Sequence, residues 1–100
     1  QTCALPILIK FIARKRHSSQ ILAESIRKSI TGLIQPNNTR ELKKGGSDIY
    51  LLNKSTVPSV IVECGFISNP EEAKNLSDKE YQSKMAFAIY CGILEYKNKN

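Results

Sequence analysis

The sequence is poor in the residues that would assign it to several common classes of protein. Its 100 residues contain no tryptophan, one methionine and one histidine. The three cysteines, Cys3, Cys64 and Cys91, form no CxxC pair and no cysteine–histidine metal spacing, and their odd number argues against a disulfide scaffold. We therefore expect three free thiols without a chemical role.

Long apolar runs and strong clusters of charge are also missing. No stretch approaches the roughly 18–20 apolar residues of a membrane-spanning helix, so we expect no transmembrane segment in this chain. The content of 41% hydrophobic and 24% charged residues is that of an ordinary globular chain. The net charge of +6 favours anionic partners, but the basic residues are scattered apart from short runs at 14–16 and 43–44. Runs this short are typical of a solvated surface, and we predict no nucleic-acid binding.

The first seven residues, QTCALPI, lack an initiator methionine and lack the basic region of a signal peptide. They resemble the translation of a sequencing-library adapter, so we leave residues 1–7 out of the fold prediction as a non-native scar. The rest of the chain has the size of one small domain or of part of a larger one. At the other end, we expect residues 98–100 to be a frayed tail.

The predicted elements follow the order of an α/β protein. Apolar residues recur every three or four positions over residues 18–34, which predicts a helix that ends before Pro36. Residues 49–52 are typical of a short strand, and the apolar run 59–64 predicts a central strand covered on both faces. Because two strands are too few for such a sheet, we expect further strands upstream of residue 1.

Two helices are predicted after these strands. Asn69 and Pro70 are a cap and a first helical residue, so a short helix should run to about Leu76. The capping box at 77–80 predicts the start of a longer helix. One face of that helix carries an apolar stripe that we expect to pack in the core: Tyr81, Met85, Ala88, Ile89, Gly92, Ile93 and Tyr96.

Glu63 is the one charged residue in the apolar run 57–67. An ionised carboxylate is costly to bury unless it is paired or hydrogen-bonded. Glu63 ends the predicted strand just before Gly65, and ligand sites in open α/β sheets form beyond the carboxyl ends of strands. A carboxylate placed there can take a proton from water or give one to a leaving group. Position alone leaves open whether Glu63 serves a catalytic or ligand site or a structural salt bridge.

The segment PSVIVECGFISNPEE, residues 58–72, resembles the zinc-dependent N-acetylmuramoyl-L-alanine amidases (the amidase-3 family) and is closest to their sporulation and germination type. The resemblance begins near residue 18 and covers the C-terminal half of that domain. It implies a three-layer α/β/α fold with a mostly parallel central sheet, of which residues 8–97 would be the C-terminal portion. It also implies peptidoglycan as the partner and an extracytoplasmic location, on the cell wall or spore cortex side of the membrane.

In that family, two histidines and a glutamate from the N-terminal half hold zinc, and a further glutamate, here Glu63, completes the catalytic centre. The resemblance implies that a zinc-bound water attacks the amide between N-acetylmuramic acid and L-alanine, with Glu63 as general base and then general acid. The ligand motifs are absent from residues 1–100, and His17 does not match one. A catalytic zinc needs about three protein ligands, so we expect them upstream and expect this chain alone to hold no zinc.

Two other functions stay open. The chain could be a non-catalytic wall-binding or regulatory remnant, since it lacks the zinc ligands and is basic. It could also belong to a different zinc hydrolase, such as a peptidase, on a related scaffold. The long signature around Glu63 favours the amidase. The substrate-binding residues are not predicted.

Overall fold

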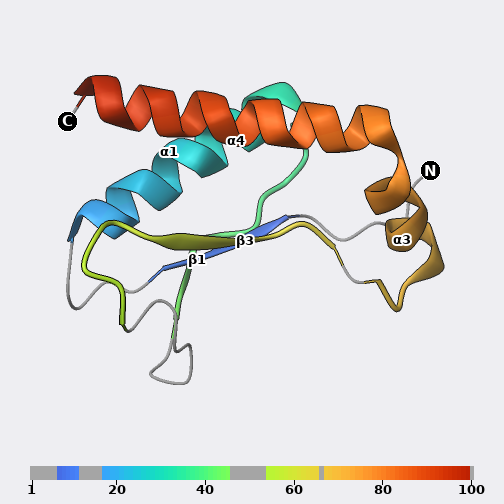
Figure 1. Cartoon of the computed structure of the whole chain (residues 1–100), viewed down its shortest axis with the longest axis horizontal. Coiled ribbons are helices and arrows are strands. Elements are labelled where there is room, and N and C mark those ends of the chain that lie inside the picture. The colour runs from blue at the N-terminus through green and yellow to red at the C-terminus, as the bar shows by residue number, and fades with distance from the viewer. Residues whose placement is uncertain (1–6, 12–16, 46–53, 66, 100) are drawn as a thin grey trace.

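The structure is a computed structural model that describes residues 7–11, 17–45, 54–65 and 67–99. The chain has a mixed α/β fold in which a small sheet packs against helices (Figure 1). The strand expected at 49–52 lies outside the described residues. The elements are β1 (Leu8–Phe11), α1 (His17–Leu33), β2 (Lys43–Lys44), β3 (Val60–Glu63), α3 (Pro70–Ser77) and α4 (Lys79–Lys99).

The described strands lie in the order β2-β1-β3. β1 pairs with β2 in parallel and with β3 in antiparallel orientation, so the described part of the sheet is mixed, whereas a mostly parallel sheet was expected for the whole domain. β1 is the central strand of the three, whereas β3 has one described neighbour and is half-buried along its whole length. The β-branched run of β3 therefore indicated a strand correctly, and its central place in the sheet of the whole domain stays a prediction.

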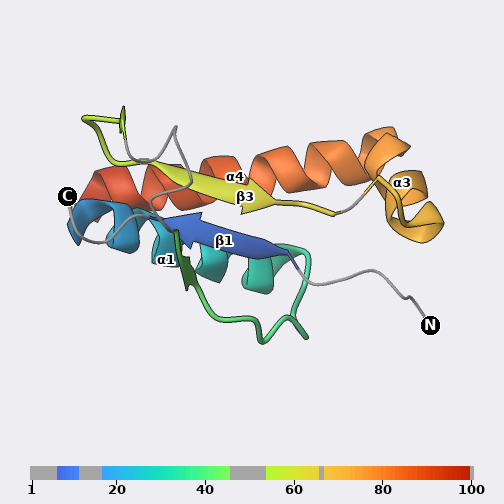
Figure 2. The same cartoon turned by 90° about the horizontal axis from the view of Figure 1, so that it is seen from below.

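Helices α1 and α4 lie on the same side of the sheet (Figure 1). α1 contacts both β1 and β3, and α4 packs mainly against α1. Seen from below, β1 and β3 lie in front of the helices, and no described helix covers this side (Figure 2). The described residues thus form a sheet with one helical face and one face without a helix.

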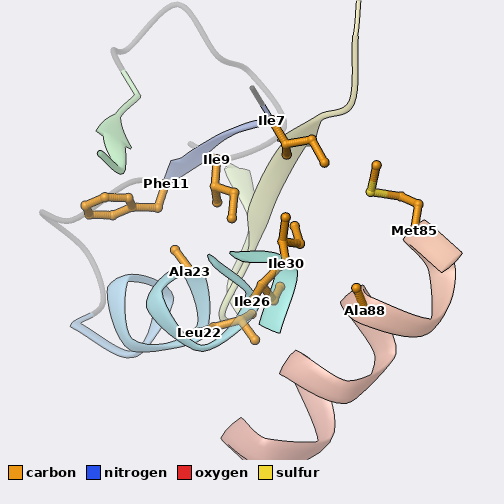
Figure 3. Close-up of a cluster of buried hydrophobic side chains, with 9 residues drawn as sticks. All are labelled: Ile7, Ile9, Phe11, Leu22, Ala23, Ile26, Ile30, Met85 and Ala88. Atoms are coloured by element: carbon orange, nitrogen blue, oxygen red, sulfur yellow. The ribbon is translucent and has the colours of Figure 1, made fainter. Parts of the chain in front are cut away.

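The core lies between the sheet and the two long helices (Figure 3). Period-two alternation turns Ile7, Ile9 and Phe11 toward the helices. The other fully buried members come from the helices: Leu22, Ala23, Ile26, Ile30, Met85 and Ala88.

Ile7 belongs to this core although we excluded it from the fold prediction. Its side chain is 3% exposed. Its N–H donates to Gln35 Oε1 and its carbonyl accepts from Asn38 Nδ2, both at 3.0 Å. Residues 1–6 lie outside the described residues, so the non-native origin of that segment stays a prediction.

Of the two C-terminal helices, α3 begins as its cap predicts, whereas α4 begins after Asp78, because Ser77 still belongs to α3 and its hydroxyl donates to the Lys74 carbonyl. Asn69 Oδ1 accepts from the backbone N–H groups of Glu71 and Glu72, which confirms the predicted cap of α3. Along α4, the predicted stripe is buried or half-buried except for Ile93, which is exposed. α4 continues through Asn98 to Lys99, where we expected a frayed tail, and its last turn carries a Lys99–Glu95 ion pair of 3.1 Å.

Candidate active site

Glu63 is the last residue of β3, and the strand turns its side chain away from the helices. Val60, Val62 and Cys64 pack against the core. Because side chains alternate along a strand, Ile61 and Glu63 lie on the face that no described helix covers. The Glu63 side chain is 33% exposed, so its carboxylate can still meet a ligand or water.

Lys10 on the central strand holds one oxygen of this carboxylate. Lys10 Nζ lies 2.8 Å from Glu63 Oε2, and the Lys10 side chain is 24% exposed. Leu8 faces Glu63 and Ile61 faces Lys10 in the register, so the ion pair runs diagonally between the strands. Within the described part of the chain, Glu63 Oε1 has no hydrogen bond or ion pair.

Glu63 therefore forms a salt bridge, and this contact leaves open whether its role is structural or catalytic. A carboxylate with one oxygen paired and one accessible can still exchange a proton. Sequence reasoning missed Lys10, because β1 borders the segment that was set aside. The available signal was a single lysine in the otherwise apolar run 7–11.

The turn after Glu63 closes tightly on α3. Gly65 has φ +158°, a backbone conformation that disfavours side chains. A Cβ at this position would lie 3.4 Å from both Glu72 Oε1 and Leu76 Cδ1. Glu72 is 2% exposed, so a buried acid and a glycine together set the path of the chain just beyond Glu63.

A partly buried cluster of Cys64, Glu72 and Tyr81 lies on the helical side of the same strand end. Burial raises the pKa of the Cys64 thiol, which stays protonated and unreactive near neutral pH. Burial also raises the pKa of the Tyr81 hydroxyl, and negative charge on Cys64 and Glu72 raises it further. Cys64 and Cys91 are free thiols, whereas Cys3 lies outside the described residues. Glu63 and Cys64 are thus adjacent in sequence, but the Glu63 carboxylate is partly exposed and the Cys64 thiol packs against the core.

Comparison with known proteins identifies the family. The sequence profile of the N-acetylmuramoyl-L-alanine amidases matches residues 8–95, which include β1, β3 and Glu63. This chain belongs to that amidase family. The germination-specific N-acetylmuramoyl-L-alanine amidase of Bacillus subtilis is 47% identical over 60 residues, which are 60% of this chain and 25% of that protein.

Solved amidase structures share the fold. The CwlD amidase from Clostridioides difficile, determined in complex with the GerS lipoprotein, has a TM-score of 0.86 and 36% identity over 100% of this chain and 50% of that one. The amidase AmiC2 of Nostoc punctiforme has a TM-score of 0.78 and 33% identity over 93% of this chain and 48% of that one. The chain therefore spans about half the length of these two solved amidases.

The described residues of this amidase chain do not fit a zinc site. No group of three histidine, cysteine, aspartate or glutamate side chains among them could hold a metal ion. His17 is the exposed first residue of α1. A zinc site needs about three protein ligands, so these residues cannot complete one by themselves.

None of the described helices is both long enough and apolar enough to cross a bilayer.

Proposed function

We propose that this chain is the C-terminal part of a peptidoglycan hydrolase that cleaves the amide between N-acetylmuramic acid and L-alanine. The observation that carries the proposal is the half-exposed carboxylate of Glu63 at the end of β3, inside the segment that matches the amidase family. The relatives named N-acetylmuramoyl-L-alanine amidase support cleavage of this same bond.

Glu63 serves this reaction as general base and then as general acid. Its carboxylate takes a proton from the water that attacks the lactyl carbonyl carbon. The carbon–nitrogen bond then breaks, and Glu63 returns the proton to the amine of L-alanine. The products are a carboxylate on the muramic acid and a free amino terminus on the peptide. Glu63 Oε1 is suited to this exchange, because Lys10 occupies Oε2.

The family resemblance extends the proposal to zinc and to location. Zinc supplies Lewis-acid activation of the carbonyl and of water when it is bound, and its ligands belong to the part of the protein upstream of this chain. Relatives that act on the cell wall support an extracytoplasmic location for the intact protein.

The test compares Glu63→Gln with the wild type in the intact protein that contains this chain. The amide keeps the size of the side chain but cannot act as a base, so the rate of peptide release should fall by a factor of about 10²–10⁴. Zinc content and melting temperature should stay unchanged. Glu24→Gln, at an exposed site on α1, is the matched control and should keep the full rate. Retention of most activity in Glu63→Gln would remove Glu63 from the mechanism.

A second candidate function is adhesion to anionic wall polymers without catalysis. It is favoured by the net charge of +6 and by the lack of a zinc ligand set among the described residues. Cosedimentation of the intact protein with purified peptidoglycan distinguishes the two. Salt-sensitive binding with no release of peptide would favour adhesion over hydrolysis.

A further inference from the structure

We propose that Lys10 is a positioning residue for Glu63, which holds one carboxylate oxygen so that the other faces the reacting water and amine. The inference rests on the proposed function and adds a second residue to the site. It starts from the 2.8 Å contact between Lys10 Nζ and Glu63 Oε2, two groups on neighbouring strands of the same sheet.

Stability does not explain why a lysine stands at this place. Lys10 lies in the central strand of the described sheet, between Ile9 and Phe11, which are both buried. A partly exposed ion pair contributes little to folding, and apolar side chains of similar size would hold two strands together at least as well. Since the Lys10 charge in β1 adds little to stability, its presence is better explained by a role in the chemistry of its partner, Glu63.

The geometry restricts Glu63 in the way that proton transfer requires. A glutamate at the end of a strand has several accessible rotamers, and only some aim an oxygen at the substrate. Lys10 on β1 limits the rotamers of the Glu63 side chain. The tight turn at Gly65 limits the path of the backbone just after Glu63. Lys10 thus restricts the orientation of the Glu63 carboxylate.

The experiment measures kcat and KM for peptide release by the intact protein with Lys10→Met, Lys10→Arg and Lys43→Met. Lys10→Met keeps the length of the side chain and removes the charge, and it should lower kcat by about 10- to 100-fold while KM stays close to that of the wild type. Lys10→Arg should restore most of kcat. Lys43 faces Lys10 on β2 and is exposed, so Lys43→Met is the matched control and should behave as the wild type.

A double variant separates positioning from a general effect. If Lys10 acts through Glu63, adding Lys10→Met to Glu63→Gln should lower kcat no further. Unchanged kcat in Lys10→Met, or a full additional loss in the double variant, would overturn the positioning role and leave Glu63 catalytic. High activity in Glu63→Gln would instead overturn the proposed function itself. Should Lys10→Met fail to fold, Lys10→Gln replaces it, with the same loss of kcat expected and with unchanged kcat overturning the role.

Discussion

At the scale of single residues, two neighbouring side chains at the end of β3, Glu63 and Cys64, lie in different environments. The Glu63 carboxylate lies beside Lys10 on the face without a described helix. Cys64 points the opposite way, into a cluster with Glu72 and Tyr81 where burial raises the pKa of both the thiol and the phenol. The alternation of a β-strand is sufficient to place the partly exposed Glu63 carboxylate next to a thiol that faces the helices.

The partly buried cluster of Cys64 and Tyr81 predicts a loss of stability at alkaline pH. Cys64 and Tyr81 are neutral when protonated, and the folded state keeps their protons to higher pH than the unfolded chain does. The folded state therefore binds more protons in this range, and the free energy of unfolding falls as pH rises. The contribution is complete below the ordinary pKa values, 9.0 for Cys64 and 10.0 for Tyr81, and is lost as pH rises from there through the raised values.

Urea unfolding of the intact protein between about pH 7 and about pH 10.5 measures this effect. Tyr81→Phe and Cys64→Ala should each make the alkaline decline shallower than in the wild type. Tyr90→Phe, at an exposed tyrosine on α4, is the control and should leave the decline as it is. Equal slopes in all four proteins would show that burial of these groups does not control alkaline stability.

At the scale of elements, the contact between α1 and α4 depends on one glycine. A Cβ at Gly92 would lie 2.6 Å from Ile26 Cα and 3.1 Å from Ile26 N, both backbone atoms that cannot move aside alone. Ser25 Oγ donates to the Gly92 carbonyl at 2.6 Å, and Ser29 Oγ donates to the Ala88 carbonyl at 2.5 Å. The two helices thus approach closely enough for side chains of one to bond the backbone of the other.

Gly92→Ala should lower the free energy of unfolding by about 1–3 kcal/mol, because the added methyl group forces the helices apart. Gly32→Ala is the matched control in α1, where a Cβ would meet nothing within 4 Å. It should be neutral or should raise stability by up to about 1 kcal/mol through helix propensity. Chemical denaturation of both variants in the intact protein checks the pair, and equal effects would contradict the close-approach account.

The elements that the sequence predicted are those with strong local signals. Helix periodicity, the cap at Asn69 and the apolar run of β3 depend on neighbouring residues, and each produced an element within a few residues of the expected bounds. β1 was missed because it borders the segment that was set aside, and β2 was missed for a physical reason. β2 consists of two exposed lysines, and among the described strands it pairs with β1. The residues around Lys43 and Lys44 carry no pattern from which this pairing could be predicted.

The candidate site was predictable in part for the same reason. Glu63 stands out in its own segment as a charge in an apolar strand, whereas Lys10 lies 53 positions earlier (63 − 10) and meets it only through the strand register. A single sequence does not specify that register before both strands are known. The positioning residue therefore became visible only in three dimensions.

At the scale of the whole molecule, α4 carries an apolar outer face. Phe87 and Tyr90 are 58% and 57% exposed, and Ile93 and Leu94 are each 41% exposed. Leu33 of α1, 53% exposed, borders the same region together with Phe87 and Tyr81. Large apolar side chains gathered on one side of a small chain favour association with another apolar surface.

The 100-residue chain alone should accordingly self-associate or melt at low temperature, although its charge of +6 opposes association. Size-exclusion chromatography and a thermal melt measure both properties. Phe87→Lys with Tyr90→Lys should shift the chain toward the monomer, while Lys28→Glu, at an exposed site of α1, should not. A monodisperse wild-type monomer with a cooperative transition well above room temperature would show that this chain completes its own core.

The central claim is that the intact protein cleaves the bond between muramic acid and L-alanine and that Glu63 carries the proton. Mass spectrometry of purified peptidoglycan after digestion tests it most directly, because each class of hydrolase leaves different ends. The account predicts peptides with a new free amino group on L-alanine, together with glycan strands that carry a free lactyl carboxylate. These products should appear with the wild type and be lost with Glu63→Gln. New reducing sugar ends, or new amino termini within the peptide and none on L-alanine, would contradict it.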